Sequence, residues 1–117
     1  MGLGLSGGER RREPRLPLQL TAHCQIGGDY ERGAVVDLSR NGVGLRTGRS
    51  FPRGTPMRVA LALPYTEGPK FCTLSGTVVR SGNNEIGVQL DPGVSRSDRD
   101  VLNGFLALLN TRRQAML

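Results

Sequence analysis

The sequence predicts a six-stranded antiparallel β-barrel followed by a single C-terminal helix. Six short segments alternate apolar and polar side chains, which is typical of strands with one buried face, and turn-forming Gly, Pro, Asn and Asp residues separate them. Strands at hairpin spacing favour an antiparallel barrel, because closure leaves no unpaired edge. Near the end of the chain the apolar period becomes helical. At 117 residues, the chain has room for one domain with one modest core.

The six predicted strands cover residues 18–26, 30–38, 43–47, 57–63, 70–80 and 85–90. In the first strand, Leu20, Ala22 and Cys24 share one face, and His23 lies on the other, so we expect His23 at the surface. Gly76 interrupts the fifth strand and is expected to mark a bulge or a sharp bend. Residues 18–90 thus form the predicted barrel.

Residues 97–114 form the predicted helix. Ser97 and Asp100 have the spacing of a capping box, and apolar residues recur at helical spacing from Val101 to Leu109. The apolar stripe has two interpretations: a lid packed on the mouth of the barrel, which we favour, or an interface for a partner. Gly104 lowers helix propensity by about 1 kcal/mol relative to alanine, so the helix depends on packing.

The composition favours an anionic partner and a reducing, cytoplasmic environment. The formal net charge is +6, and all but one of the 16 Lys and Arg residues are arginine. Such a surface attracts nucleotides, nucleic acids or acidic proteins. The two cysteines lack metal-ligand spacing and are expected to be buried free thiols. No segment reaches the roughly 18 apolar residues of a membrane span, and residues 1–9 are expected to be a flexible leader.

The chain lacks the residue sets of common catalytic and metal centres. His23 is the single histidine, and no cluster of acidic residues accompanies it. Ser39 does not lie in a nucleophile elbow, and no phosphate-binding glycine loop is present. We therefore expect a protein that is not an enzyme and that carries neither a metal ion nor a cofactor.

Two polar motifs lie about one hairpin apart. The first, RREPR at residues 11–15, places Arg11 and Arg15 four residues apart, and Pro14 disfavours a helix there. Residues 10–17 are therefore expected to form an irregular arm. The second motif, DLSRNG at residues 37–42, falls at the connection between two predicted strands, where a rigid scaffold can present side chains to a ligand.

The residue types in both motifs suit a guanine nucleotide. The guanidinium groups of Arg11 and Arg15 can pair with guanine N7 and O6 or contact phosphate. The carboxylate of Asp37 can accept from the N1 and N2 hydrogens of guanine, and Ser39 adds a hydroxyl group. Gly42 permits a tight turn and the close approach of a ligand.

The order and spacing of these motifs resemble the RxxxR and (D/N)xSxxG signature of the PilZ domain family, bacterial proteins that bind the second messenger cyclic di-GMP. The Ile-Gly-Val-Gln run at residues 86–89 also resembles the last strand of PilZ domains. The resemblance implies that residues 10–117 form a PilZ-like domain. It also implies that cyclic di-GMP binds to Arg11, Arg15, Asp37, Ser39 and Gly42.

Arg10, Arg12 and Arg40 are further candidates for ligand contact. Arg10 either stacks on a guanine or is a solvated charge. The resemblance implies that the residue at this place in the motif influences whether one ligand or an intercalated pair is bound. The expected function is that of a non-catalytic receptor that passes the signal to a partner protein, with an output such as motility or biofilm formation.

Two alternative functions remain open. The first is a PilZ-like protein-interaction module without a ligand. The second is a basic barrel that binds single-stranded nucleic acid, which is disfavoured because two Tyr and three Phe provide few platforms for base stacking.

Overall fold

The protein is described by a computed structural model that covers the backbone of residues 20–115 and the side chains of residues 20–111. The elements along the chain are β1 (Thr21–Ile26), β2 (Asp29–Leu38), β3 (Gly42–Thr47), β4 (Pro56–Tyr65), β5 (Gly68–Ser81), β6 (Glu85–Leu90) and α1 (Arg96–Ala115). Every predicted element is present, and most ends differ by no more than one or two residues. The first strand begins at Thr21, while residues 18 and 19 lie outside the described part.

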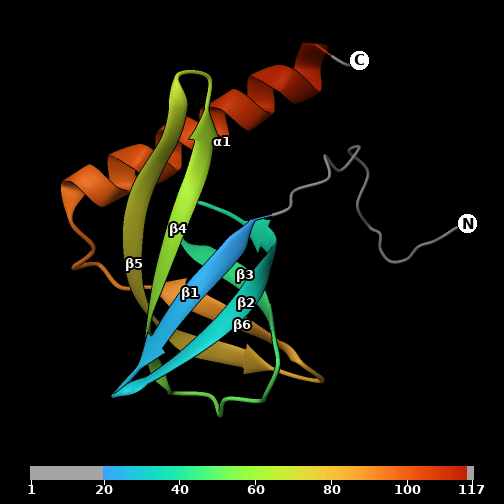
Figure 1. Cartoon of the computed structure of the whole chain (residues 1–117), viewed down its shortest axis with the longest axis vertical. Coiled ribbons are helices and arrows are strands. Elements are labelled where there is room, and N and C mark those ends of the chain that lie inside the picture. The colour runs from blue at the N-terminus through green and yellow to red at the C-terminus, as the bar shows by residue number, and fades with distance from the viewer. Residues whose placement is uncertain (1–19, 116–117) are drawn as a thin grey trace, which may run out of the picture.

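The strands close into a barrel in the order β1–β2–β3–β6–β5–β4, and each neighbouring pair is antiparallel (Figure 1). Pairing of β1 with β4 closes the barrel, with Ala22 opposite Leu61. β5 pairs with β4 along Gly68–Thr77 but with β6 only from Gly76 onward. The end of β4 and the start of β5 therefore project as a hairpin beside α1 (Figure 1). The predicted six-stranded antiparallel barrel with a C-terminal helix is confirmed.

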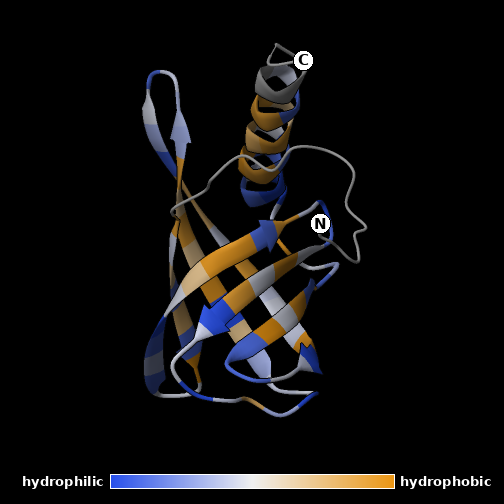
Figure 2. Ribbon diagram, turned by 90° about the vertical axis from the view of Figure 1, so that its right-hand side faces the viewer, coloured by the Kyte–Doolittle hydropathy of each residue, from blue (hydrophilic) through white to orange (hydrophobic). Residues whose placement is uncertain are grey.

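The barrel interior is filled by every second residue of each strand. In β4, for example, Met57, Val59, Leu61 and Leu63 are buried while Arg58 between them is exposed. The same alternation gives the apolar and polar bands along the strands in Figure 2. One core contains the largest fully buried side chains of five strands and the helix, namely Leu45, Leu63, Leu74, Ile86, Leu102, Val59, Val78, Val88 and Cys24. His23 is exposed, as predicted.

Cys24 and Cys72 are buried free thiols in this core, as predicted. Burial raises the pKa of each thiol from 9.0 to about 11; the negative charges of Glu31 near Cys24 and Asp98 near Cys72 make a smaller contribution in the same direction. Both groups therefore remain protonated well above neutral pH in the folded protein.

We expect these thiols to react with iodoacetamide at pH 8 at least about 100-fold more slowly in the folded protein than in urea, because only the thiolate is nucleophilic.

The raised pKa values of the two thiols also make the free energy of unfolding depend on pH. The stability that the protonated thiols contribute is fully present below pH 9.0, and it decreases as the pH approaches about 11. Urea unfolding at pH 7, 9 and 10.5 measures this decrease. The double variant C24V/C72V should lose less stability over the same range, and an equal loss would contradict the assignment.

Two β-bulges interrupt the ladders, and neither lies at Gly76. The register shifts between Val35 and Asp37 in β2, and between Val78 and Arg80 in β5. The prediction of a bulge at Gly76 is therefore wrong, and the alternative of a sharp bend there stays a prediction. Gly76 is required for close packing instead, because a Cβ there would lie against the Gln89 carbonyl oxygen and 2.7 Å from Val88 Cγ1.

Helix α1 is capped by Ser95, the residue before its first turn, rather than by the predicted Ser97–Asp100 box. The Ser95 hydroxyl accepts a hydrogen bond from the backbone N–H of Asp98 (3.1 Å) and donates one to its carboxylate (2.8 Å). The other oxygen of Asp98 accepts from the backbone N–H of Thr73 in β5 (3.0 Å). The cap therefore lies two residues upstream of the predicted one, at a position where the Asp98 carboxylate can bond both to the capping Ser95 and to β5.

The apolar stripe of α1 packs mainly against β5 and β4, which supports intramolecular packing rather than a free partner interface. Leu102 and Phe105 are buried in the core, and the Tyr65 hydroxyl donates a hydrogen bond to the Val101 carbonyl oxygen. A Cβ at Gly104 would lie 2.5 Å from the same hydroxyl oxygen. The glycine that weakens the helix therefore provides the space in which Tyr65 docks.

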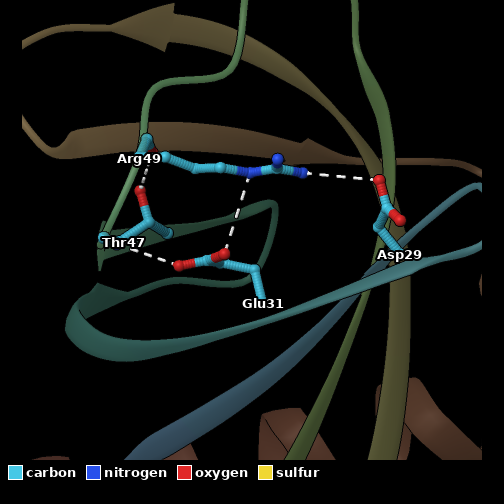
Figure 3. Close-up of polar contacts among 5 residues, drawn as sticks. Asp29, Glu31, Thr47 and Arg49 are labelled. Carbon is cyan, nitrogen blue, oxygen red and sulfur yellow. Dashed lines mark hydrogen bonds and ion pairs between the residues drawn. The ribbon is translucent and has the colours of Figure 1, made fainter.

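The barrel end opposite the projecting hairpin is held by Arg49 (Figure 3). Its guanidinium group lies 3.7 Å from the carboxylates of both Asp29 and Glu31, and its backbone carbonyl accepts from Thr47 Oγ1 at 2.7 Å. The guanidinium carbon also lies 4.8 Å from the ring centroid of Phe51, which is buried. These contacts fasten the loop after β3 to the start of β2.

Candidate functional site

The second motif forms the tight connection between β2 and β3. The backbone N–H of Ser39 donates to the carbonyl oxygen of Gly42 (2.9 Å), and the Ser39 hydroxyl donates to the same oxygen (3.3 Å). Strand β6, which pairs with β3, anchors the turn, because Leu90 N–H donates to the Asn41 carbonyl oxygen at 2.9 Å. Asp37, Ser39 and Arg40 are exposed around this turn.

Gly42 is needed for strand packing rather than for a special turn conformation. It is not among the glycines with positive φ in the described chain. A Cβ at this position would lie 3.0 Å from the Val88 carbonyl oxygen of β6. Gly42 therefore has a packing role that was not predicted. It also lines the groove described below, and its contact with a ligand stays a prediction.

A row of four residues crosses the outer surface of four neighbouring strands. Asp37 in β2 lies opposite Gly44 in β3, Gly44 lies opposite Gly87 in β6, and Gly87 lies opposite Arg80 in β5. The two glycines provide a floor without side chains. The charged residues flank that floor, one of each sign.

The side chains of Asp37 and Arg80 lie over this floor. A Cβ on Gly44 would be 2.9 Å from both carboxylate oxygens of Asp37, and a Cβ on Gly87 would be 3.0 Å from an Arg80 guanidinium nitrogen. Each charged residue directly follows a bulge, at Val36 in β2 or at Val79 in β5. Bulges re-aim side chains, so the two bulges explain how both charged groups point across the row.

These residues line an open groove of about 330 Å³. Its lining comprises Asp37, Ser39, Asn41, Gly42, Val43, Gly44, Val79, Arg80, Gly87, Val88 and Gln89. Val79 is 43% exposed, which gives the polar groove one apolar wall. A carboxylate, a hydroxyl group, an amide and a guanidinium group thus surround a flat floor, an arrangement suited to a planar base that carries donors, acceptors and an attached anion.

The structure brings three predicted residues, Asp37, Ser39 and Gly42, to this groove. Arg40 is exposed in the turn but is not part of the groove lining. Arg10, Arg11, Arg12 and Arg15 lie outside the described residues, so their predicted contacts stay predictions.

Sequence reasoning missed Arg80 and the glycine pair. Gly44 and Gly87 each occupy an outward-facing position between two buried residues of a strand. Glycine at an outward strand position, where the alternation predicts a polar side chain, is a sequence signal that could have identified both residues. No local pattern marks Arg80, because its direction depends on a bulge that only strand pairing reveals.

Among the described residues, no three His, Cys, Asp or Glu side chains group as metal ligands, and α1 is not apolar enough along its length to cross a membrane. The fold and the groove define a small barrel with a solvent-open, polar site on its outer wall.

The chain belongs to the PilZ domain family, whose sequence pattern matches residues 9–108. Comparison with curated proteins gave no match. Two solved structures share the fold. The crystal structure of the PilZ domain of CeSA from a cellulose-synthesising bacterium has a TM-score of 0.63 at 15% identity, over 81% of this chain and 96% of that one. The Bacillus subtilis inhibitor of motility MotI/DgrA has a TM-score of 0.68 at 19% identity, over 90% of this chain and 54% of that one. This chain thus spans about half of MotI/DgrA.

Proposed function

We propose that the protein is a non-catalytic, cytoplasmic receptor for cyclic di-GMP that passes the signal to a partner protein. The observation that carries this proposal is the groove, in which Asp37 and Ser39 of the family motif lie beside a glycine floor and Arg80. Membership of the PilZ family supports a cyclic di-GMP signalling role.

The groove offers complementary groups to a guanine base. Asp37 accepts hydrogen bonds from guanine N1 and N2, the edge that an arginine cannot recognise. Arg80 adds donors at the other end of the row, for the O6 and N7 edge or for a phosphate. The glycine floor allows a flat base to lie directly on the strands.

The predicted arm joins the barrel close to this groove. The carbonyl oxygen of Leu20 accepts a hydrogen bond from Val35 N–H at 2.9 Å, and Val35 precedes Asp37 by two residues in β2. Leu20, the first described residue after the predicted arm, is therefore bonded to the strand that carries Asp37, two residues before it. In this proposal Arg11 and Arg15 close over the ligand from the arm, while Arg10, Arg12 and Arg40 provide weaker contacts to guanine or phosphate.

Ordering of the arm against the barrel changes the surface that the partner contacts. By linkage, the partner and the ligand then change each other's affinity by the same factor. Motility and biofilm formation are the outputs that we propose.

Calorimetric titration with cyclic di-GMP, beside GTP and cyclic di-AMP, tests the receptor function. We expect selective binding with a micromolar or lower Kd. The variants Arg15→Ala and Asp37→Ala should each weaken binding by roughly 30-fold or more, since truncating one member of a charge-assisted contact costs about 2–5 kcal/mol. Arg53→Ala, an exposed arginine in the loop after β3, is the matched control and should bind normally.

The stoichiometry distinguishes the two interpretations of Arg10. Two ligands per chain, reduced to one by Arg10→Ala, would support stacking, and one ligand per chain would leave Arg10 as a solvated charge. No heat at high ligand concentration would overturn the receptor function and favour an interaction module without a ligand. Equal binding of an oligonucleotide by the wild type and Asp37→Ala would favour the nucleic-acid alternative.

A further inference from the structure

We propose that the barrel wall opposite the groove is a docking surface for a partner protein that presents acidic side chains. This surface, the β1–β4 face, contains His23, Tyr30, Arg32, Arg58 and Phe71. In the closed strand order, β1 and β4 lie opposite β3 and β6, which hold the glycine floor. The proposal extends the proposed function by assigning the surface of this protein that the partner contacts. Its evidence comes from the β1–β4 face alone.

Strand register brings the face together as two rows that each cross four strands. In the first, Arg32 lies opposite His23, His23 opposite Ala60, and Ala60 opposite Thr73. The second runs through Tyr30, Gln25, Arg58 and Ser75. The residues that alternate with these rows, such as Cys24, Val59 and Leu74, are buried, so both rows point outward.

The alternation also separates the charges of the β1–β2 hairpin. Asp29 and Glu31 occupy the other set of β2 positions, opposite Ile26 and Cys24, and both contact Arg49 (Figure 3). Their neighbour Arg32 points outward, directly opposite His23. No carboxylate occurs in either row, and no ion pair joins Arg32 or Arg58 to a carboxylate of the described residues.

The carboxylate of Asp98 lies at the β5 end of the first row, where it is held by Ser95 and by the Thr73 N–H. Among the described residues, Arg32 and Arg58 therefore have no carboxylate partner of the kind found elsewhere on the barrel. On β3 and β6, by contrast, Arg46 pairs with Glu85 at 2.9 Å. An anionic group that binds beside Arg32 or Arg58 would gain charge-assisted contacts that no described carboxylate provides. Charge complementarity thus selects an acidic partner.

The shape and composition of the face favour a protein partner over a nucleic acid. Short side chains at Ala60 and Thr73 keep its centre flat, and Tyr30 and Phe71 are each 74% exposed. Arginine, tyrosine and phenylalanine are enriched in the cores of protein interfaces. A nucleic-acid surface would instead need a continuous track of cations with stacking platforms.

A groove on this face provides a seat for an acidic side chain. It has a volume of about 340 Å³ and is lined by Gln25, Gly27, Pro56, Met57, Arg58, Ser75 and Gly76. Arg58, Gln25 and Ser75 are neighbours in one row, so a carboxylate there can receive several hydrogen bonds. Arg58 is therefore the expected anchor of the interaction.

NMR chemical-shift mapping on the full ¹⁵N-labelled chain tests the proposal. The probe is a synthetic glutamate-rich peptide, with the matching glutamine peptide and a single-stranded oligonucleotide as comparisons. We expect shifts from the glutamate peptide confined to the β1–β4 face. R32E/R58E should weaken that binding at least about tenfold, whereas R53E, the same charge reversal in the loop after β3, should not.

Shifts centred on Asp37 and Arg80, shifts spread over the whole barrel, or equal loss in R53E would overturn the proposal. Tighter binding of the oligonucleotide at the same face would overturn it in favour of nucleic acid. Tyr30→Ser and Phe71→Ser, at exposed positions, test the same face if the charge reversals alter folding. Cyclic di-GMP titration of R32E/R58E is expected to match the wild type, so failure of ligand binding and failure of this face give different results.

Discussion

Gly76→Ala is expected to lower the free energy of unfolding by roughly 3 kcal/mol, the upper end of the cost of overpacking a core. The added methyl group would meet the Gln89 carbonyl oxygen and lie 2.7 Å from Val88 Cγ1. Backbone atoms of β6 would have to move, because a carbonyl group cannot rotate away as a flexible side chain does. At this point β5 begins to pair with β6, so a shift there loosens the ladder beside the groove.

Urea unfolding followed by circular dichroism measures the effect of Gly76→Ala. Gly93→Ala is the matched control, because a Cβ at Gly93 meets nothing within 4 Å and its φ is not positive. The control should change stability by less than about 1 kcal/mol, as surface substitutions usually do. Equal stability of the two variants would contradict the close packing at Gly76.

Gly87→Val is expected to weaken cyclic di-GMP binding on the order of 100-fold while the barrel remains folded. Its Cβ would displace the Arg80 side chain, which lies 3.0 Å away, and its methyl groups would occupy the glycine floor. Arg80 is exposed and flexible, so this displacement costs little stability. Valine is also favourable in a strand, and we expect the unfolding free energy to change by less than about 1 kcal/mol.

Titration calorimetry and urea unfolding of Gly87→Val separate binding from stability. Gly28→Val, in the turn between β1 and β2 with no atom within 4 Å of its Cβ, is the control and should bind like the wild type. Normal affinity in Gly87→Val would show that the ligand does not use the glycine floor. Loss of both binding and folding would contradict the predicted independence of the two.

The sequence was sufficient to predict the barrel because its strands alternate clearly and its turns carry strong local preferences. Residues 85–90, for example, have inward Ile86, Val88 and Leu90, and the strand is found with those bounds. The helix cap was placed two residues too late. Ser97 and Asp100 have the same local spacing as Ser95 and Asp98, and only the contact of Asp98 with β5 distinguishes them.

The candidate site could be predicted only where it is local in the chain. Asp37, Ser39 and Gly42 fall within six residues and share one turn, so their motif was visible. Arg80 comes from β5, which does not pair with β2 and is separated from it by β3 and β6 on the groove side of the barrel, and a bulge sets its direction. The packing roles of Gly42 and Gly76 depend on atoms of β6 that are distant in sequence, which is why local sequence patterns did not reveal them.

The contact between Asp98 and Thr73 also bears on solubility. The first half of β5 projects past β6 and would otherwise offer open backbone groups to another chain, the usual starting point of edge-to-edge aggregation. The carboxylate of Asp98 occupies the Thr73 N–H, and the backbone N–H of Asp91 occupies the Ser75 carbonyl oxygen at 2.8 Å. The segment leading into α1 thus shields a strand edge, so damage to the helix start would promote self-association as well as unfolding.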